Sequence, residues 1–169
     1  MNSKKDKPFN WQTVDDHYVD VYETLDTTYS YIYTRSAAAL VAMARPKPAQ
    51  TLVDLACGTG TSTRVLADAV APGGKVLGID FNAAMLERAR YKFQDHMDIS
   101  LVFAPIQDFI KVLKTYGWMG DINAIFSSFS YFYVYDFHEQ LQKDIYDVLS
   151  PGGVLAFNIG TFLTLQRNF

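Results

Sequence analysis

The strongest constraint on this chain is the stretch Thr51–Ser62, in which a short apolar run ends in a turn of small residues. Runs of this kind are typical of buried strands, and a helical pattern begins directly after the turn. Gly58 and Gly60 lack the side chains that would keep a ligand away from the backbone. Thr61 and Ser62 are suited to cap the helix. The stretch therefore predicts a strand, a tight turn and a helix N-terminus whose free N–H groups face a ligand.

Three interpretations of this turn compete. A dinucleotide-binding motif needs a third glycine after Gly60, but threonine and serine follow here. A turn that binds nothing is the second interpretation. The third rests on the segment Asp54–Gly60, which resembles the acid-x-Gly-x-Gly-x-Gly motif of class I S-adenosylmethionine (SAM)-dependent methyltransferases, with an alanine at the first glycine. The resemblance implies that SAM is contacted by Asp54, Ala56, Cys57, Gly58 and Gly60.

Composition limits the class of protein. The chain has 169 residues, enough for one ordinary domain, and its 49% hydrophobic content fits a globular protein with a core. A net charge of −3 gives no sign of a basic face, so we expect no nucleic-acid partner. The single cysteine, Cys57, cannot form an internal disulfide, and we expect a reducing, cytoplasmic location. No apolar run approaches the ~20 residues that span a bilayer, so we expect no membrane segment.

The residues before the first strand divide into two parts. Residues 1–8 are polar and are expected to form a disordered tail rather than a signal peptide. Residues 9–48 show two helical apolar patterns with a break near residues 26–28, and two prolines end the second pattern. In the resembled family, helices at this position often fold over the cofactor. The resemblance implies that Tyr29 and Tyr33 reach the cofactor, although such rings also pack simply on a sheet.

The second apolar strand, residues 75–80, ends in Asp80. This acid follows the glycine turn by about 20 residues, where α/β nucleotide sites place a carboxylate on the ribose hydroxyls. The alternative role is to cap the next helix, but Asn82 is already a good cap. The following residues are similar to the family's pattern, which implies that Phe81 and Met85 sandwich the adenine ring. For Met85, a plain core role is the alternative.

The third strand, residues 100–104, leads into a departure from the family's pattern. Members often carry an aspartate there that accepts a hydrogen bond from the adenine amino group, whereas this sequence has Pro105. Three replacements are open: the side chain of Gln107, the side chain of Asp108, or the backbone N–H of Ile106.

The fourth strand, residues 120–128, is expected at the centre of the sheet, so the transferred methyl group should point to its carboxyl end, near Ser127. We expect Tyr131 and Tyr133, which follow it, to orient the acceptor, because an unperturbed phenol with a pKa near ~10 is a poor base. The alternative is that both rings only line the acceptor pocket. His138 is the best histidine candidate. No His, Cys and carboxylate cluster has metal-ligand spacing, so we expect no metal.

The segment Leu149–Gly153, followed by an apolar strand at residues 154–159, is also similar to the family. The chain stops at Phe169, before the family's further helix and antiparallel strands. We expect either a piece of a longer protein or a sheet edge that a partner chain, such as a second copy, completes, because an uncovered edge invites pairing.

Together these features predict an α/β fold: a doubly wound, mostly parallel, Rossmann-like sheet of five strands over residues 49–169, with a helical cap at residues 9–48. The first functional hypothesis is a SAM-dependent methyltransferase for a small aromatic or apolar acceptor. The second is a non-catalytic SAM-fold subunit that needs a partner chain. The third, an NAD-dependent oxidoreductase, is disfavoured by the missing third glycine and by the Leu149–Gly153 segment.

Overall fold

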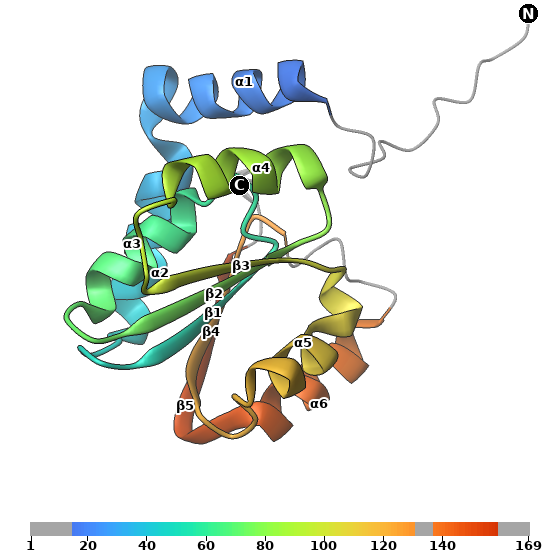
Figure 1. The fold of residues 1–169 in the computed structure, drawn as a ribbon. Coiled ribbons are helices and arrows are strands. Elements are labelled where there is room, and N and C mark those ends of the chain that lie inside the picture. Colours follow the sequence, from blue (N-terminus) through green and yellow to red (C-terminus); the bar gives the residue numbers. More distant parts are fainter. Residues whose placement is uncertain (1–14, 131–136, 159–169) are drawn as a thin grey trace, which may run out of the picture.

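One parallel β-sheet forms the centre of the molecule. The computed structural model describes residues 15–130 and 137–158. Within them, five strands lie in the order β3-β2-β1-β4-β5, each parallel to its neighbours (Figure 1). This confirms the predicted doubly wound, Rossmann-like sheet. The strands are β1 (Thr51–Leu55), β2 (Lys75–Asp80), β3 (Ile99–Phe103), β4 (Ile122–Ser128) and β5 (Leu149–Asn158).

Helices cover both faces of the sheet, as parallel sheets require. Helices α2 and α3 pack on one face and α5 and α6 on the other, while α1 lies across α4 (Figure 1). In the part of the chain that is described, no helix has the length and apolar character needed to cross a membrane. The helices are α1 (Asp16–Thr24), η2 (Leu25–Ser30), α2 (Ile32–Ala44), α3 (Thr61–Val70), α4 (Ala83–Lys92), η3 (Ile106–Asp108), α5 (Phe109–Tyr116) and α6 (His138–Val148).

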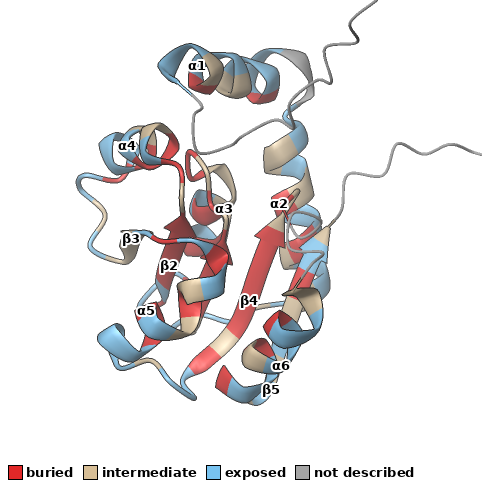
Figure 2. Cartoon of the chain, turned by 90° about the vertical axis from the view of Figure 1, so that its right-hand side faces the viewer, coloured by how far each residue is buried: buried red, intermediate tan, exposed pale blue. Residues whose placement is uncertain are grey.

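The central strands are buried on both faces because successive side chains point to opposite sides. In β1, Val53 and Leu55 join the cluster under α5 and α6, and Leu52 joins the cluster under α2 and α3. Figure 2 shows the buried strands between the exposed outer surfaces of the helices. Burying a side chain of this size contributes about 1.5–3 kcal/mol. The short apolar run of β1 is therefore enough to fix where the turn that follows it lies.

The fifth strand begins earlier than predicted. Leu149 already pairs with Ile122, residues 150–153 then leave the ladder, and pairing resumes at Val154. Pro151 has no N–H to donate, so this segment interrupts the strand as a bulge instead of preceding it as a loop. The third and fourth strands differ from the prediction by only one or two residues at their ends.

The cap, residues 16–44, contains the two helices and the break that the sequence predicts. The break is a π-helical turn, η2, after which Tyr31 has a left-handed backbone with φ of 53°. The buried carboxylate of Asp26 accepts hydrogen bonds from the N–H groups of Tyr33 (2.7 Å) and Thr34 (3.1 Å) at the start of α2. These donors and the helix dipole stabilise the carboxylate there. Helix α2 ends just before the two prolines, as predicted.

Gly60 offers a test of how the turn after β1 is packed. It has φ of +83°, and a Cβ built on it would lie 2.4 Å from Cε2 of Phe93. Gly117 has a similar φ of +70° but open space around it. We expect Gly60→Ala to lower the free energy of unfolding by about 2–4 kcal/mol, through left-handed strain and displacement of Phe93. Gly117→Ala should cost only the strain, about 1 kcal/mol. Denaturant unfolding measures both, and equal losses would contradict this packing.

Candidate functional site

The carboxyl edge of the sheet defines the candidate site. The strand order reverses between β1 and β4, so the connections after these two strands diverge and leave a position where ligands bind in open α/β sheets. The loop after β1, residues 56–60, is named the glycine loop here. Strand β2 ends beside it, because Leu55 and Ile79 are paired in parallel register. The ends of β1, β2 and β4 therefore meet at one edge.

Left-handed residues shape the glycine loop. Ala56, Gly58 and Gly60 have φ values of 57°, 55° and 83°. A left-handed conformation costs an alanine about 1–2 kcal/mol, which is a physical reason for a glycine at this position of the resembled motif. Nothing lies within 4 Å of a Cβ built on Gly58. This side of the loop is therefore open to the close approach of a ligand.

Asp80, at the end of β2, is buried and holds the glycine loop. Its Oδ2 accepts from the N–H of Gly58 (2.8 Å), and its Oδ1 accepts from the N–H of Asn82 (2.8 Å). Burial raises the pKa of Asp80, although these backbone donors oppose the rise. Each carboxylate oxygen can accept a further hydrogen bond. Asn82 takes the capping role, as predicted, because its side chain accepts from the N–H of Met85 (2.8 Å).

Asp54 lies in the middle of the sheet and is fully buried. Its Oδ2 accepts from the hydroxyls of Ser62 (2.8 Å) and Thr63 (2.7 Å). Its Oδ1 has no hydrogen-bond partner among the described residues. Burial raises the pKa of Asp54 to about 6, although the two hydroxyls act in the opposite direction. The site therefore contains a buried carboxylate with one oxygen to which no residue of 15–130 or 137–158 donates.

The predicted helix cap is wrong. Helix α3 begins after Gly60, which is left-handed and caps the helix with no side chain. The hydroxyl of Ser62 instead donates a hydrogen bond to Asp54. The reason is tertiary: the Asp54 carboxylate is fully buried and out of reach of water, so the nearby hydroxyls of Ser62 and Thr63 donate to it.

Cys57 packs inside the turn, in agreement with the prediction that it is a small packing residue. It is 4% exposed, and burial, followed by the charges of Asp80 and Asp54, raises the pKa of its thiol well above the ordinary value. A neutral thiol is a poor nucleophile. A Cβ built on Gly78 of β2 would lie 2.9 Å from the Cys57 sulfur. The Cys57 side chain therefore fits beside β2 because position 78 is a glycine.

Three rings, named the aromatic wall, stand at the same edge. Tyr22 of α1 stacks on Tyr33 of α2 with centroids 4.2 Å apart, and Tyr33 meets Phe129 edge-on at 5.5 Å. Burial raises the pKa of Tyr22 well above its ordinary value, with further contributions from Tyr33 and from the charges of Asp26, Asp54 and Asp80. The Tyr22 phenol therefore lies within electrostatic reach of the buried carboxylates.

Of these rings, the sequence singled out Tyr33 but not Tyr22 or Phe129. Tyr22 belongs to the same helical stripe as other apolar residues, and its stacking on Tyr33 depends on the π-helical turn between them. Phe129 takes a left-handed backbone, φ 57°, and its N–H donates to Oδ1 of Asn158 (2.6 Å). Neither feature has a local sequence signal. The side chain of Tyr29 lies outside the part of the chain that is described.

Ser127, at the end of β4, is buried. Its hydroxyl lies 2.7 Å from that of Ser130, which also donates to the carbonyl of Leu55 (3.3 Å). These bonds tie the end of β4 to the start of the glycine loop.

The residues expected around adenine differ in exposure. Met85 and Ile106 are buried, Phe81 is half-buried and Gln107 is exposed. Asp108 forms an ion pair with Lys111 (2.6 Å), so its carboxylate already has a partner.

Two of the three predicted catalytic residues, Tyr131 and Tyr133, lie outside the described residues. His138 is half-buried at the first position of α6. Within residues 15–130 and 137–158, no three His, Cys, Asp or Glu side chains are arranged to hold a metal ion.

Comparison with known proteins decides the family. A family model described as "Methyltransferase domain" matches residues 52–153, more than half of the chain. The chain belongs to the class I SAM-dependent methyltransferases. It is 34% identical over 134 residues to the trans-aconitate 2-methyltransferase of Paracidovorax citrulli, covering 75% of this chain and 45% of that protein. It is also 34% identical over 122 residues to the demethylmenaquinone methyltransferase of Symbiobacterium thermophilum, covering 67% of this chain and 43% of that protein.

Solved structures agree on the methyltransferase fold. A putative SAM-dependent methyltransferase from Methanococcus maripaludis matches with a TM-score of 0.68 and 19% identity, covering 92% of this chain and 68% of that one. A putative methyltransferase of Haloferax volcanii, solved with a methyltransferase activator, matches with a TM-score of 0.66 and 22% identity, covering 85% and 59%. The chain spans less than half the length of the curated methyltransferases that it matches.

The residues of the candidate site have a chemistry that fits SAM. The open side of Gly58 allows a ligand to approach the loop backbone, and Asp80 has acceptor capacity left for hydroxyl groups. Oδ1 of Asp54 is buried and has no donor among the described residues. Leaving such an oxygen unsatisfied costs free energy, and an ammonium group, which the amino-acid part of SAM carries, is the kind of donor that would satisfy it.

Asp54 should make the stability of this methyltransferase domain fall as pH rises. Its pKa is about 6 in the folded state and 3.8 for an ordinary aspartate. The folded state therefore holds the extra proton between about pH 4 and pH 6, and stability is lost as pH rises through this range, by about 3 kcal/mol. We expect Asp54→Asn to flatten this decline in denaturant unfolding. The exposed Asp68→Asn, on α3, should keep the wild-type profile, and the same profile for both variants would contradict the assignment.

Proposed function

We propose that this chain is the SAM-binding part of an enzyme that transfers a methyl group from SAM to a small acceptor molecule. The observation that carries the proposal is the arrangement of Asp54, Asp80 and the open glycine loop at the switch point of the sheet. Membership of the methyltransferase family supports it. The single cysteine, Cys57, is buried and free, which is typical of proteins in a reducing compartment and supports a cytoplasmic location.

We assign roles within the cofactor site by chemistry. Asp80 would accept from the ribose hydroxyls, since a carboxylate can accept from two donors. The free oxygen of Asp54 would face the ammonium group of SAM, and the glycine loop residues Ala56, Cys57, Gly58 and Gly60 would approach it through their backbone. Phe81 and Met85 would contact adenine.

The adenine amino group needs a hydrogen-bond partner other than the aspartate that family members often carry. Three candidates stay open: the side chain of Gln107, the side chain of Asp108, whose Oδ1 pairs with the exposed Lys111, and the backbone N–H of Ile106. The exposure of Gln107 leaves its amide free to turn toward a ligand.

When bound, SAM supplies an electrophilic methyl group, so the protein's work is proximity and alignment. The aromatic wall (Tyr22, Tyr33, Phe129) would exclude water and favour a positive charge nearby through the ring faces. The acceptor side of the site would be completed by Ser127, Tyr29, Tyr131, Tyr133 and His138. The tyrosine hydroxyls would orient the acceptor.

We propose a small aromatic or apolar acceptor. The relatives are named for trans-aconitate, a carboxylate, and for demethylmenaquinone, an apolar quinone. A multiply charged carboxylate needs cations. Arg88 and Lys92 on α4 are already paired with acidic residues. Arg64, at the start of α3, stands over the Phe93 ring. The aromatic wall is the observation that supports the apolar alternative.

A second candidate function is a SAM-fold subunit that acts only with a partner chain, which could be a second copy. The chain spans less than half of its curated relatives, and one structural neighbour was solved together with an activator protein. In that case the chain would bind cofactor, or hold the partner, without transferring a methyl group alone.

Cofactor binding is the first test. We expect the 169-residue chain to bind S-adenosylhomocysteine with micromolar affinity in calorimetry and not to bind NAD, because the glycine loop lacks the third glycine. A folded chain that binds neither ligand would contradict the proposal and favour the partner-dependent subunit.

Asp80→Ala should weaken S-adenosylhomocysteine binding by about 1–3 kcal/mol through loss of charge-assisted hydrogen bonds. The matched control is Asp121→Ala, an exposed acid before β4 at the opposite edge of the sheet. It should bind as the wild type does. Unchanged affinity in Asp80→Ala would remove this residue from the site.

Tyr131→Phe and Tyr133→Phe test the orienting role. If a hydroxyl positions the acceptor, each change should lower kcat more than it alters cofactor affinity, once an acceptor is known. Wild-type turnover in both variants would show that the two hydroxyls do not orient the acceptor and that the rings only line the pocket.

A further inference from the structure

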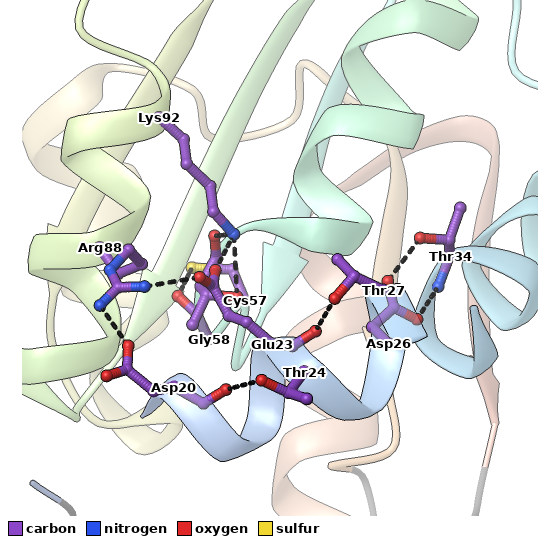
Figure 3. Close-up of polar contacts among 11 residues, drawn as sticks. Asp20, Glu23, Thr24, Asp26, Thr27, Thr34, Cys57, Gly58, Arg88 and Lys92 are labelled. Atoms are coloured by element: carbon purple, nitrogen blue, oxygen red, sulfur yellow. Dashed lines mark hydrogen bonds and ion pairs between the residues drawn. The ribbon is translucent and has the colours of Figure 1, made fainter. Parts of the chain in front are cut away.

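A cluster of charged residues connects α1 of the cap to α4 (Figure 3). Arg88 donates from Nη1 to Oε2 of Glu23 (2.7 Å) and from Nη2 to Oδ1 of Asp20 (2.7 Å). Lys92, one turn further along α4, forms an ion pair with Oε1 of Glu23. Glu23 therefore binds one cation on each carboxylate oxygen.

Lys92 also reaches the glycine loop. Its Nζ donates to the carbonyl oxygen of Thr59 (3.1 Å) and to the Thr59 hydroxyl (3.3 Å). Thr59 is buried between the two glycines of the loop. An ammonium group has three donors, and here they are shared between the cap and the loop. One side chain thus joins two segments that are far apart in the sequence.

Helix α1 has little apolar burial to hold it in place. Val19 is its only fully buried residue, whereas Val21 and the following Leu25 are more than two-fifths exposed. Helices usually dock through an apolar face, so the ion pairs carry much of this contact. Burial raises the pKa of Glu23, but hydrogen bonds and charge from Lys92 and Arg88 outweigh this effect and hold it below its ordinary value.

The two ends of the cap are held independently. Asp26 anchors the start of α2 by its hydrogen bonds to Tyr33 and Thr34. Helix α1 lies on the other side of the π-helical turn and of the left-handed Tyr31. It carries Tyr22, so a movement of α1 away from α4 would break the stacking of this ring on Tyr33.

We propose that Glu23, Arg88 and Lys92 form a latch that couples the docking of α1 to the conformation of the glycine loop. With α1 docked, Glu23 orients Lys92, Lys92 holds Thr59, and Tyr22 stacks on Tyr33. With α1 undocked, the loop loses its charged donor. The three are positioning residues, and the inference rests on the proposed SAM site. Because such coupling is reciprocal, cofactor binding also favours the docked helix.

Arg88→Gln tests the latch, because among the described residues the side chain of Arg88 donates to the cap carboxylates and not to the loop. We expect amide hydrogen exchange of α1 to become faster in the unliganded protein and the Kd of S-adenosylhomocysteine to rise by about 5- to 20-fold. Asp20→Asn, which changes a 61%-exposed side chain, should shift both quantities in the same direction, more weakly. It provides a second variant with little risk to folding.

Arg90→Gln is the matched control, since Arg90 is an exposed cation on the same helix. It should leave exchange and Kd at wild-type values. Raising salt from about 0.05 to about 0.5 M should weaken ligand binding by the wild type and much less by Arg88→Gln, because S-adenosylhomocysteine carries no net charge while the latch is ionic.

The outcomes separate the two proposals. If the wild type does not bind S-adenosylhomocysteine, the proposed function fails, while exchange of α1 still tests how the helix is held. If the wild type binds but Arg88→Gln matches Arg90→Gln in exchange and in Kd, the latch is contradicted and the SAM site stands.

Discussion

The hydrogen bond from the N–H of Gly58 to the Asp80 carboxylate is the contact on which the site depends. It joins the loop after β1 to the end of β2 at 2.8 Å. The parallel register of the two strands brings these groups together, and the left-handed Gly58 turns its N–H toward the carboxylate. The bond from the N–H of Cys57 to the carbonyl of Ile79 (3.1 Å) supports the same junction, so the two contacts together orient the open side of the loop.

Stability and function oppose each other at this edge. Asp54 and Asp80 are both buried, and burial raises the pKa of each, so the folded protein bears the cost of two desolvated carboxylates. Ser62, Thr63 and backbone donors offset part of that cost. One oxygen of Asp54 has no donor in the described part of the chain, and a ligand with donor groups can use this capacity.

The sheet and the cap are held by different forces. The sheet is packed by apolar side chains on both faces, which ties its geometry to the global stability of the domain. The first cap helix relies on ion pairs to α4 and on stacked rings. Contacts of the second kind have a smaller net free energy, so we expect α1 to open at a cost below that of global unfolding.

The sequence by itself determined the parallel five-stranded sheet, the glycine turn, Asp80 at the end of β2 and the break in the cap, because periodicity, glycine and proline act locally. It also singled out Tyr33, whose ring contacts those of Tyr22 and Phe129 in the structure. Only the tertiary structure decided that Ser62 serves Asp54 instead of the helix end and that Tyr22 joins Tyr33. It alone joined Lys92 to Glu23 and Thr59. These pairings link residues whose proximity depends on how strands and helices pack, and no local pattern encodes that distance.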